Sequence, residues 1–551
     1  MDRQRKAQLS LVCILVSIAV VDSRTPKRLV MVAALTGLLA LAVRYRSRFA
    51  VAGFALSSLF IYTGTTIGWL YGRDSHSTIA VVEDILATGW EIKPMLAPTA
   101  VPETPALHIL TGSIHLVTGL PVLPSTKGKP LLPAILPLIL VSVTYLTTYA
   151  IIRTRCRHPA ISGLAMLPVV LWFPIIEGRV AFRRQTLGLL LFTLSVLLSY
   201  RLLNDQGGKR DAGLLAFFGS LLVFSHQFTA VITLVFLVFV SIAGWINLRQ
   251  WGPNSNNGTT LVPVIVGVVF AFWYFLSWSG GSLFLTVTIH SAQLLSGTSG
   301  GGVVSELGPD FIDIVRFDFS KWFYQVALAL PLLASAVLGV RQHQLDRQQL
   351  VTIFFGGVIA VASLASYKLR ILVFDRFLTL FVVAGGSLAI IAVARLVHHT
   401  RLPQKAIIAL VLVFAVLGGA TIPNYVLADT HPNYDDGGSD QQFSASDYST
   451  LAFITEYGQF ETVLIDGYER GPIQALGRIP TTQDAATVRS ASVPRGGAAV
   501  LFDLNRHLFV AATNESYFKI RSEGLWEQYS QSQHRVYDSG RSAIFTRARN
   551  H

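Results

Sequence analysis

The chain has 551 residues, of which 52% are hydrophobic and only 14% charged, with a formal net charge of +13. Apolar runs of about 18 or more residues recur as far as residue 423, which predicts a polytopic helical membrane protein. A transmembrane β-barrel would show short alternating segments instead. We ascribe the basic excess of such a protein to cytoplasmic loops and lipid headgroups, so no nucleic-acid partner is expected.

The apolar runs predict about thirteen membrane spans. They lie near residues 9–22, 28–43, 49–72, 131–152, 159–176, 185–203, 212–225, 228–247, 261–279, 322–340, 350–367, 371–396 and 405–423. The first run follows a basic N-terminus without a small-residue cleavage site, so we expect an uncleaved helix. The two cysteines, Cys13 and Cys156, lie in or beside predicted spans, which argues against a disulfide framework.

The distribution of Lys and Arg sets the predicted orientation. With the N-terminus in the cytoplasm, the basic loops around Arg153, Lys209 and Arg347 lie inside. This requires that residues 106–120 do not cross, and we expect an interfacial or re-entrant helix there. Residues 73–130 and 280–321 then form outer loops. The second loop contains a run of three glycines, which suits either a mobile lid or a plain connector.

The composition becomes polar after about residue 424. Ser446 and Asp447 predict a helix start, while residues 461–466 and 497–503 read as strands, and residues 535–545 predict a terminal hairpin. We therefore predict an all-α transmembrane domain, residues 1–424, followed by a small extracytoplasmic α/β domain, residues 435–551. The whole chain is then a multi-pass plasma-membrane protein with a cytoplasmic N-terminus.

Familiar catalytic motifs are missing from the sequence. There is no Walker motif, HExxH, paired CxxC or GxSxG pattern, which argues against ATP-driven transport and against the common metalloproteases and serine hydrolases. The chemistry then rests on acids and bases at the outer face. The stretch from Arg73 to Pro105 follows an apolar run and is rich in acids, including Asp74, Glu83 and Asp84. A solvated loop with a surface helix is the alternative interpretation.

We identify a set of outer charged residues that could converge on one cavity. Asp74 is the candidate general base, with a helix N-cap for Ser75–Ala87 as its alternative role. His76 is a second catalytic candidate. The candidates for phosphate binding are Arg183, Arg184, Arg370 and Arg376, with headgroup snorkelling as the alternative. Glu177, His226 and Asp375 complete the set, although an interhelical structural role suits His226 as well.

Several motifs together resemble a known family. An acid opens an outer loop after a span (GRDSH), and FRRQTLGLLL, FSHQFTA and a late DRFLTLF follow. This layout resembles the polytopic glycosyltransferases of the C superfamily (GT-C), archaeal and bacterial enzymes that use polyprenyl- or dolichyl-phosphate sugars. The resemblance implies that Asp74 is the catalytic acid of the outer loop and that Arg376 meets the lipid phosphate. The loop reads D-S-H and not D-x-D, so dependence on Mg²⁺ or Mn²⁺ stays open.

The sequence thus predicts a membrane glycosyltransferase. It would move a sugar from a lipid-phosphate carrier in the membrane to a glycan, lipid or protein acceptor, with inversion at the anomeric carbon. A non-enzymatic lipid or solute transporter or flippase is the main alternative, in which the outer charges bind cargo. A membrane scaffold with an outer binding domain is the third.

Overall fold

The computed structural model describes about half of the chain, mostly helices of the middle part and strands of the C-terminal part. The described residues are 73–88, 104–122, 131–156, 161–162, 165–170, 172, 182–204, 206–251, 258–276, 311–312, 319–341, 347–368, 374–399, 449–450, 452–454, 456, 458–465, 481–482, 487–488, 490–502, 508–512, 517–521, 524–538 and 542–547. The predicted spans before residue 73 and after residue 405 therefore lie outside the described residues.

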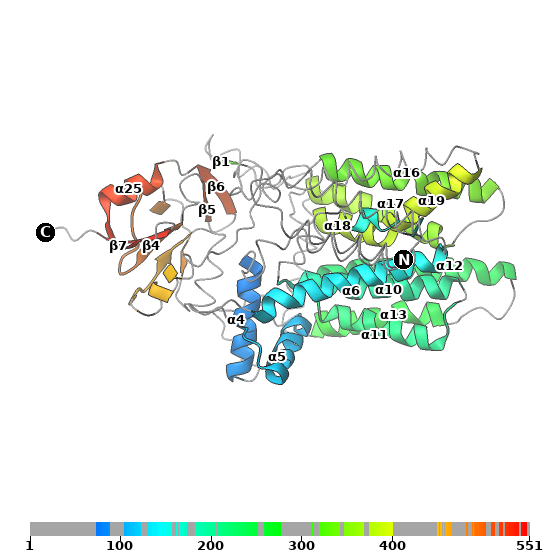
Figure 1. Ribbon diagram of the computed structural model, residues 1–551, viewed down its shortest axis with the longest axis horizontal. Coiled ribbons are helices and arrows are strands. Elements are labelled where there is room, and N and C mark those ends of the chain that lie inside the picture. Colours follow the sequence, from blue (N-terminus) through cyan, green and yellow to red (C-terminus); the bar gives the residue numbers. More distant parts are fainter. Residues whose placement is uncertain are drawn as a thin grey trace, which may run out of the picture.

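Helices dominate the part of the structure before residue 400. They are α4 (Arg73–Thr88), α5 (Ala106–Thr118), α6 (Leu131–Arg155), α8 (Leu167–Val170), α10 (Arg184–Leu203), α11 (Lys209–Val223), α12 (Gln227–Trp251), α13 (Gly258–Leu276), α16 (Phe319–Arg341), α17 (Arg347–Lys368), α18 (Phe374–Phe381), the π-helical segment η1 (Val382–Gly386) and α19 (Ser387–His399). Helix α10 packs against α6, α11 and α12, and α16 packs against α19 (Figure 1).

The centre of this bundle is apolar and aromatic. Phe192 of α10 and Phe355 of α17 both pack against Phe236 of α12, with ring centroids 5.8 and 5.2 Å away from it. The hydroxyl of buried Tyr200 donates to the carbonyl of Ala384 in the π-helical segment at 2.9 Å. A π-helix exposes carbonyls that the ordinary helical ladder would use, so a tyrosine donor stabilises the irregular turn.

Four of the described helices are long and apolar enough to cross a membrane. They are Leu131–Arg155, Arg184–Leu203, Gln227–Gly244 and Arg376–Leu396. Apolar side chains also face outward: Val264, Val268 and Phe272 of α13 recur every four residues and are exposed. An exposed apolar stripe of this kind is stable only against lipid or another protein, which agrees with the predicted membrane domain. The total of thirteen spans stays a prediction.

The segment expected to lie in the interface is a short helix. Helix α5 has 13 residues, fewer than the about 20 needed to span a bilayer. It ends at Gly119, which has a left-handed backbone and donates its N–H to the carbonyl of His115. One face buries Leu107 and His108, while Leu116 and Val117 are exposed. The helix predicted within residues 106–120 is therefore present and is too short to cross a bilayer. Its position relative to a membrane stays a prediction.

The C-terminal part contains two sheets. The five-stranded sheet has the order β3 (Thr481–Thr482), β2 (Val463–Leu464), β4 (Ala498–Phe502), β8 (Ser542–Thr546) and β7 (His534–Asp538). Strands β2, β3 and β4 pair in parallel, while β4–β8 and β8–β7 are antiparallel. The pair β7–β8 is the hairpin that the sequence predicts, and β2 and β4 lie in the two predicted strand segments.

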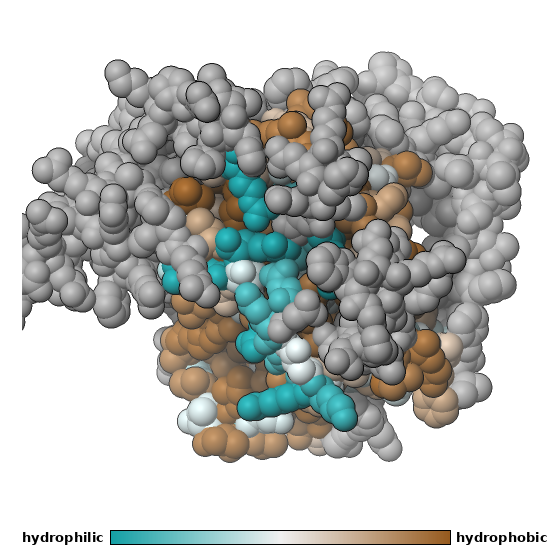
Figure 2. Space-filling view, turned by 90° about the vertical axis from the view of Figure 1, so that its right-hand side faces the viewer, coloured by the Kyte–Doolittle hydropathy of each residue, from teal (hydrophilic) through white to brown (hydrophobic). Residues whose placement is uncertain are grey.

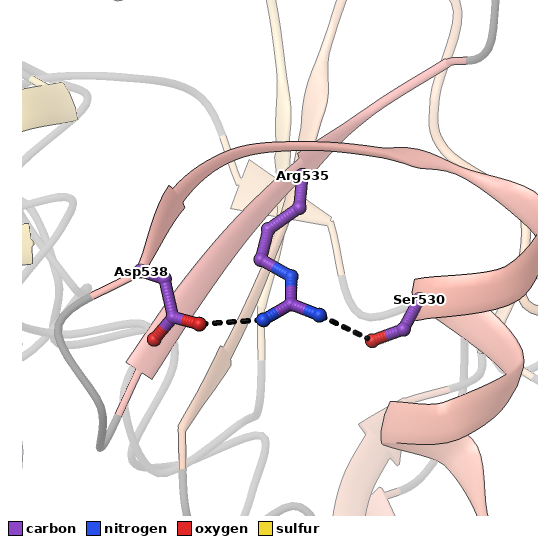
Figure 3. Close-up of polar contacts among 3 residues, drawn as sticks. All are labelled: Ser530, Arg535 and Asp538. Carbon is purple, nitrogen blue, oxygen red and sulfur yellow. Dashed lines mark hydrogen bonds and ion pairs between the residues drawn. The ribbon is translucent and has the colours of Figure 1, made fainter.

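Helix α25 (Leu525–Ser532) covers this sheet through Trp526 and Tyr529, which pack on Phe545 of β8. At the edge, Arg535 of β7 donates to Asp538 at 2.5 Å and to Ser530 of α25 at 3.4 Å (Figure 3). Charged side chains on an edge strand oppose pairing with another chain, so this end of the sheet is protected.

The second sheet has the order β1 (Phe311–Ile312), β6 (Tyr517–Arg521) and β5 (Leu508–Ala512). Strand β1 comes from the predicted outer loop 280–321 and pairs antiparallel with β6, with Phe311 opposite Ile520. This loop is therefore joined to the C-terminal part by backbone pairing at one point. The glycine run that suggested a lid or a connector lies outside the described residues. The C-terminal strands lie beyond the end of the bundle that carries α4 and α5 (Figure 1).

Candidate functional site

The acid-bearing loop begins with a helix. Asp74 and His76 lie in the first turn of α4, which starts at Arg73. The prediction of Asp74 as the N-cap of a helix starting at Ser75 is therefore wrong in position, because the helix begins two residues earlier. A carboxylate in a first turn is still favoured by the helix dipole. The side chains of both residues lie outside the described residues.

The other candidates divide in a similar way. Glu177 and Arg370 lie outside the described residues, and Asp375 is described only by its backbone, in the first turn of α18. Arg183, Arg184, His226 and Arg376 have described side chains, all of them half-buried. Arg183 occupies the N-cap position of α10 in an extended backbone conformation, and Arg184 is the first residue of that helix. Both arginines therefore lie at its start.

Helix α5 is joined to the start of α10 by a side-chain contact. The guanidinium of Arg184 donates to the hydroxyl of buried Thr104 at 2.7 Å. Two residues later, the N–H of Ala106 donates to the carbonyl of Phe224, in the turn between α11 and α12, at 3.0 Å. The start of α5 is therefore fixed against two other elements, and Arg184 is held where they meet.

His226 lies in that same turn and caps α12. The backbone N–H of Thr229 donates to Nδ1 at 3.3 Å, and the Thr229 hydroxyl lies 2.7 Å from the same atom. Since Nδ1 accepts a hydrogen bond, the proton of the neutral ring belongs on Nε2. Close approach to α10 depends on Gly188, where an added Cβ would lie 2.8 Å from the Cβ of His226.

Two described arginines act on His226. Burial lowers the pKa of His226 well below its usual value, and the guanidinium groups of Arg376 and then Arg184 lower it further. Two arginines separated by almost two hundred positions in the chain thus act on one imidazole. The structure brings together the starts of α10, α12 and α18 at one end of the bundle.

Helix α18 is fixed beside this cluster by contacts with three segments. The rings of Phe377 and Phe228 pack edge to face with centroids 4.7 Å apart. The indole of Trp172 donates to the hydroxyl of Thr379 at 2.8 Å, and the amide of Gln325 donates to the Leu378 carbonyl at 3.4 Å. These contacts fix the first turn of α18, and with it Arg376, relative to His226.

His108 is a second histidine beside Arg184. Its side chain is 1% exposed, and neither ring nitrogen makes a well-formed hydrogen bond within the described part of the chain. Burial lowers the pKa of His108 to about 3, the charge of Arg184 contributes, and the backbone of Thr104 opposes the shift. His108 is therefore neutral at any physiological pH.

This arrangement suits an anion. Guanidinium groups from α10 and α18 and the Nε2–H of a neutral imidazole are hydrogen-bond donors, and a phosphate offers the matching acceptor oxygens. Among the side chains that the structure describes, no three His, Cys, Asp or Glu residues form a metal-binding group. The acids that would serve a divalent metal, Asp74 and Glu177, are not among those side chains, so the question of Mg²⁺ or Mn²⁺ stays open.

Sequence reasoning missed two contributors to this cluster. Thr104 directly precedes the proline that caps α5, a position where the backbone is restricted and a helix begins. Gly188 stands in the apolar run of α10, where a glycine costs helix stability and therefore signals close packing. The two signals were present in the sequence, but the partner that each residue contacts lies far away in the chain.

Comparisons with known proteins agree with the helical architecture. No protein-family model and no curated protein matches the sequence. The crystal structure of the Archaeoglobus fulgidus oligosaccharyltransferase in the apo form matches with a TM-score of 0.52 and 13% identity, over 83% of this chain and 70% of that chain. The chain therefore shares its helical fold with that oligosaccharyltransferase structure.

Two further solved structures match at lower similarity. ArnT from Cupriavidus metallidurans bound to undecaprenyl phosphate has a TM-score of 0.46 and 11% identity, covering 86% of this chain and 97% of that chain. Arabinofuranosyltransferase AftD from Mycobacteria has a TM-score of 0.48 and 13% identity, covering 92% of this chain and 42% of that chain.

Proposed function

We propose that the protein is an integral membrane glycosyltransferase that moves a sugar from a lipid-phosphate carrier to an acceptor at the outer face. The observation that carries the proposal is that the starts of α10 and α18, which carry Arg184 and Arg376, meet at the turn of His226, where Gly188 lies against His226 and Phe377 packs on Phe228. The shared fold with an oligosaccharyltransferase supports the reaction class.

In the proposed reaction the acceptor oxygen attacks the anomeric carbon as the bond from that carbon to the phosphate oxygen breaks. The acceptor proton passes to the carboxylate of Asp74, and the electron pair of the broken bond stays on the lipid phosphate. Attack from the side opposite the leaving group inverts the anomeric carbon. The charge that grows on the phosphate is stabilised by Arg184 and Arg376, and His226 donates through Nε2.

Neutral His226 has a defined part in this scheme. A third full positive charge would repel the two guanidinium groups, whereas a neutral ring donates a hydrogen bond without adding charge. Its proton is held on Nε2 by the bond between Nδ1 and Thr229. The same bond fixes the ring orientation, so the donor is in place before the phosphate arrives.

The test is a transfer assay of the purified full-length protein with a panel of polyprenyl-phosphate sugars. We expect Asp74→Asn to lower kcat by about 100-fold or more, the range for a lost general base. Arg376→Gln should chiefly raise the KM for the donor, while Arg495→Gln, an exposed arginine of the C-terminal part, should change neither constant. Full transfer activity in Asp74→Asn would refute the role of Asp74 as the base. Uptake of a solute without formation of a glycosylated product would favour the transporter alternative.

A further inference from the structure

The end of the bundle opposite α4 and α5 is basic. Arg155, which ends α6, donates to the amide oxygen of buried Gln348 in α17, and Gln348 donates to the Tyr200 carbonyl of α10 at 2.9 Å. Arg347, which begins α17, donates to the Leu203 carbonyl at 3.2 Å. These contacts join the end of α6 and the start of α17 to the end of α10. Figure 2 shows a band of hydrophilic residues across this face, between hydrophobic flanks.

The described side chains at this end are mostly cationic. Arg201 of α10 pairs with Asp211 of α11 at 3.2 Å. Arg155 and Arg347 donate to the neutral oxygens named above. Lys209 and Arg210, at the start of α11, are both exposed. Among the described side chains of residues 196–223, Asp211 is the one carboxylate beside the three cations Arg201, Lys209 and Arg210, and such an excess attracts anions.

Helix α11 carries the further feature that defines the ligand. Arg210, Leu214 and Phe217 are spaced four and three residues apart, which puts them on one face of the helix. Leu214 and Phe217 are 36% and 59% exposed. This face of α11 therefore has a cation at one end and apolar side chains along the rest. The distance along the helix axis from Arg210 to Phe217 is about 10 Å, at 1.5 Å per residue. The matching ligand is anionic at one end and apolar along the rest.

We propose that this face of α11 binds an anionic phospholipid. Its phosphate lies against Lys209 and Arg210, and its acyl chain lies along Leu214 and Phe217. Arg201, held by Asp211, is placed beside the headgroup. A free phosphate would use the cations but not the apolar stripe, and a zwitterionic lipid would use the stripe without the net charge. The proposal does not depend on the transferase activity, because it concerns the opposite end of the bundle.

The test measures lipid association of the purified full-length protein by native mass spectrometry, with phosphatidylglycerol, phosphatidylcholine and inorganic phosphate in separate titrations. We expect tight association of phosphatidylglycerol alone. The double variant Lys209→Gln/Arg210→Gln should bind it about 30-fold more weakly, since each basic residue near an anionic lipid surface contributes roughly fivefold. The control variant Arg495→Gln/Arg547→Gln removes the same charge from two exposed arginines of the C-terminal part.

Three outcomes would overturn the proposal. Equal weakening by the two double variants would mean that net charge alone governs association. Equal occupancy by phosphatidylcholine and phosphatidylglycerol, or an undiminished phosphatidylglycerol signal in Lys209→Gln/Arg210→Gln, would mean that the cations at the start of α11 do not select the lipid. Size-exclusion chromatography of each variant reports whether it has folded. Because Lys209 and Arg210 are both exposed, we expect the elution profile of the variant to match that of the parent protein.

Discussion

Gly188→Ala is the sharpest test of the cluster around His226. The added methyl carbon would lie 2.8 Å from the Cβ of His226, 3.5 Å from Oγ1 of Thr229 and 3.6 Å from the His226 Cγ. Carbon atoms in contact prefer about 3.5–4.0 Å, so α10 and the turn must separate by close to 1 Å. Because the crowded atom is the Cβ that carries the imidazole of His226, the movement would displace the ring from the two arginines.

The expected cost follows from two opposing effects. Overpacking of this kind costs about 1–3 kcal/mol, whereas replacing glycine by alanine in a helix interior gains up to about 1 kcal/mol. Gly357→Ala is the matched control, because an added Cβ at this position of α17 meets nothing within 4 Å. We therefore expect Gly357→Ala to be neutral or stabilising and Gly188→Ala to be about 1–3 kcal/mol less stable than that control.

Thermal unfolding of the two variants measures the stability difference, and donor binding measures the effect on the site. We expect Gly188→Ala to raise the donor KM while Gly357→Ala leaves it unchanged. If Gly188→Ala were as stable and as active as Gly357→Ala, the close contact between α10 and His226 would be absent, and the geometry argued for the phosphate site would fail with it.

Three other predictions follow from named contacts. The pKa of His108 is lowered from 6.5 to about 3, so below pH 6.5 the unfolded chain takes up a proton that the folded chain does not. The contribution of His108 to the free energy of unfolding is therefore fully present above pH 6.5. It falls by about 1.36 kcal/mol per pH unit below that, or about 2 kcal/mol at pH 5. His108→Gln should reduce this loss in thermal unfolding, and an unchanged pH profile would contradict it. Thr104→Val removes the acceptor of Arg184 and should raise the donor KM several-fold with kcat little changed, whereas Thr104→Ser should retain the parent value. In a cysteine-free background, Phe311→Cys/Ile520→Cys should form a disulfide, because the two positions are opposite in the β1–β6 pair; a persistent double thiol under oxidising conditions would argue against the pairing.

The sequence was informative about helices because their apolar runs are local. Residues 185–203 and 228–247 were predicted as spans, and α10 and α12 occupy these positions. The C-terminal hairpin was equally accessible, since Ser539 and Gly540 interrupt two short β-rich segments. Both kinds of element are encoded within about twenty consecutive residues, over which periodicity and turn chemistry can be read directly.

Contacts between distant segments were not accessible in this way. Nothing in the hydropathy of Thr104 indicates Arg184 as its partner, and nothing in the loop containing Phe311 indicates pairing with Ile520. The start of α4 was displaced by two residues because both Asp74 and Ser75 are plausible first-turn residues, and propensity alone does not choose between them.

The contacts of Arg184 link the proposed phosphate site to the acid-bearing loop. Its guanidinium donates a hydrogen bond to Thr104, two residues before α5. Its charge acts on both His108 of α5 and His226, in the turn between α11 and α12. Helix α5 in turn packs against α4, the helix that carries Asp74. A movement of the acid loop would therefore alter the surroundings of Arg184, which we propose binds the carrier phosphate. In a transferase, this coupling would let the arrival of the carrier phosphate and the placement of the base depend on each other.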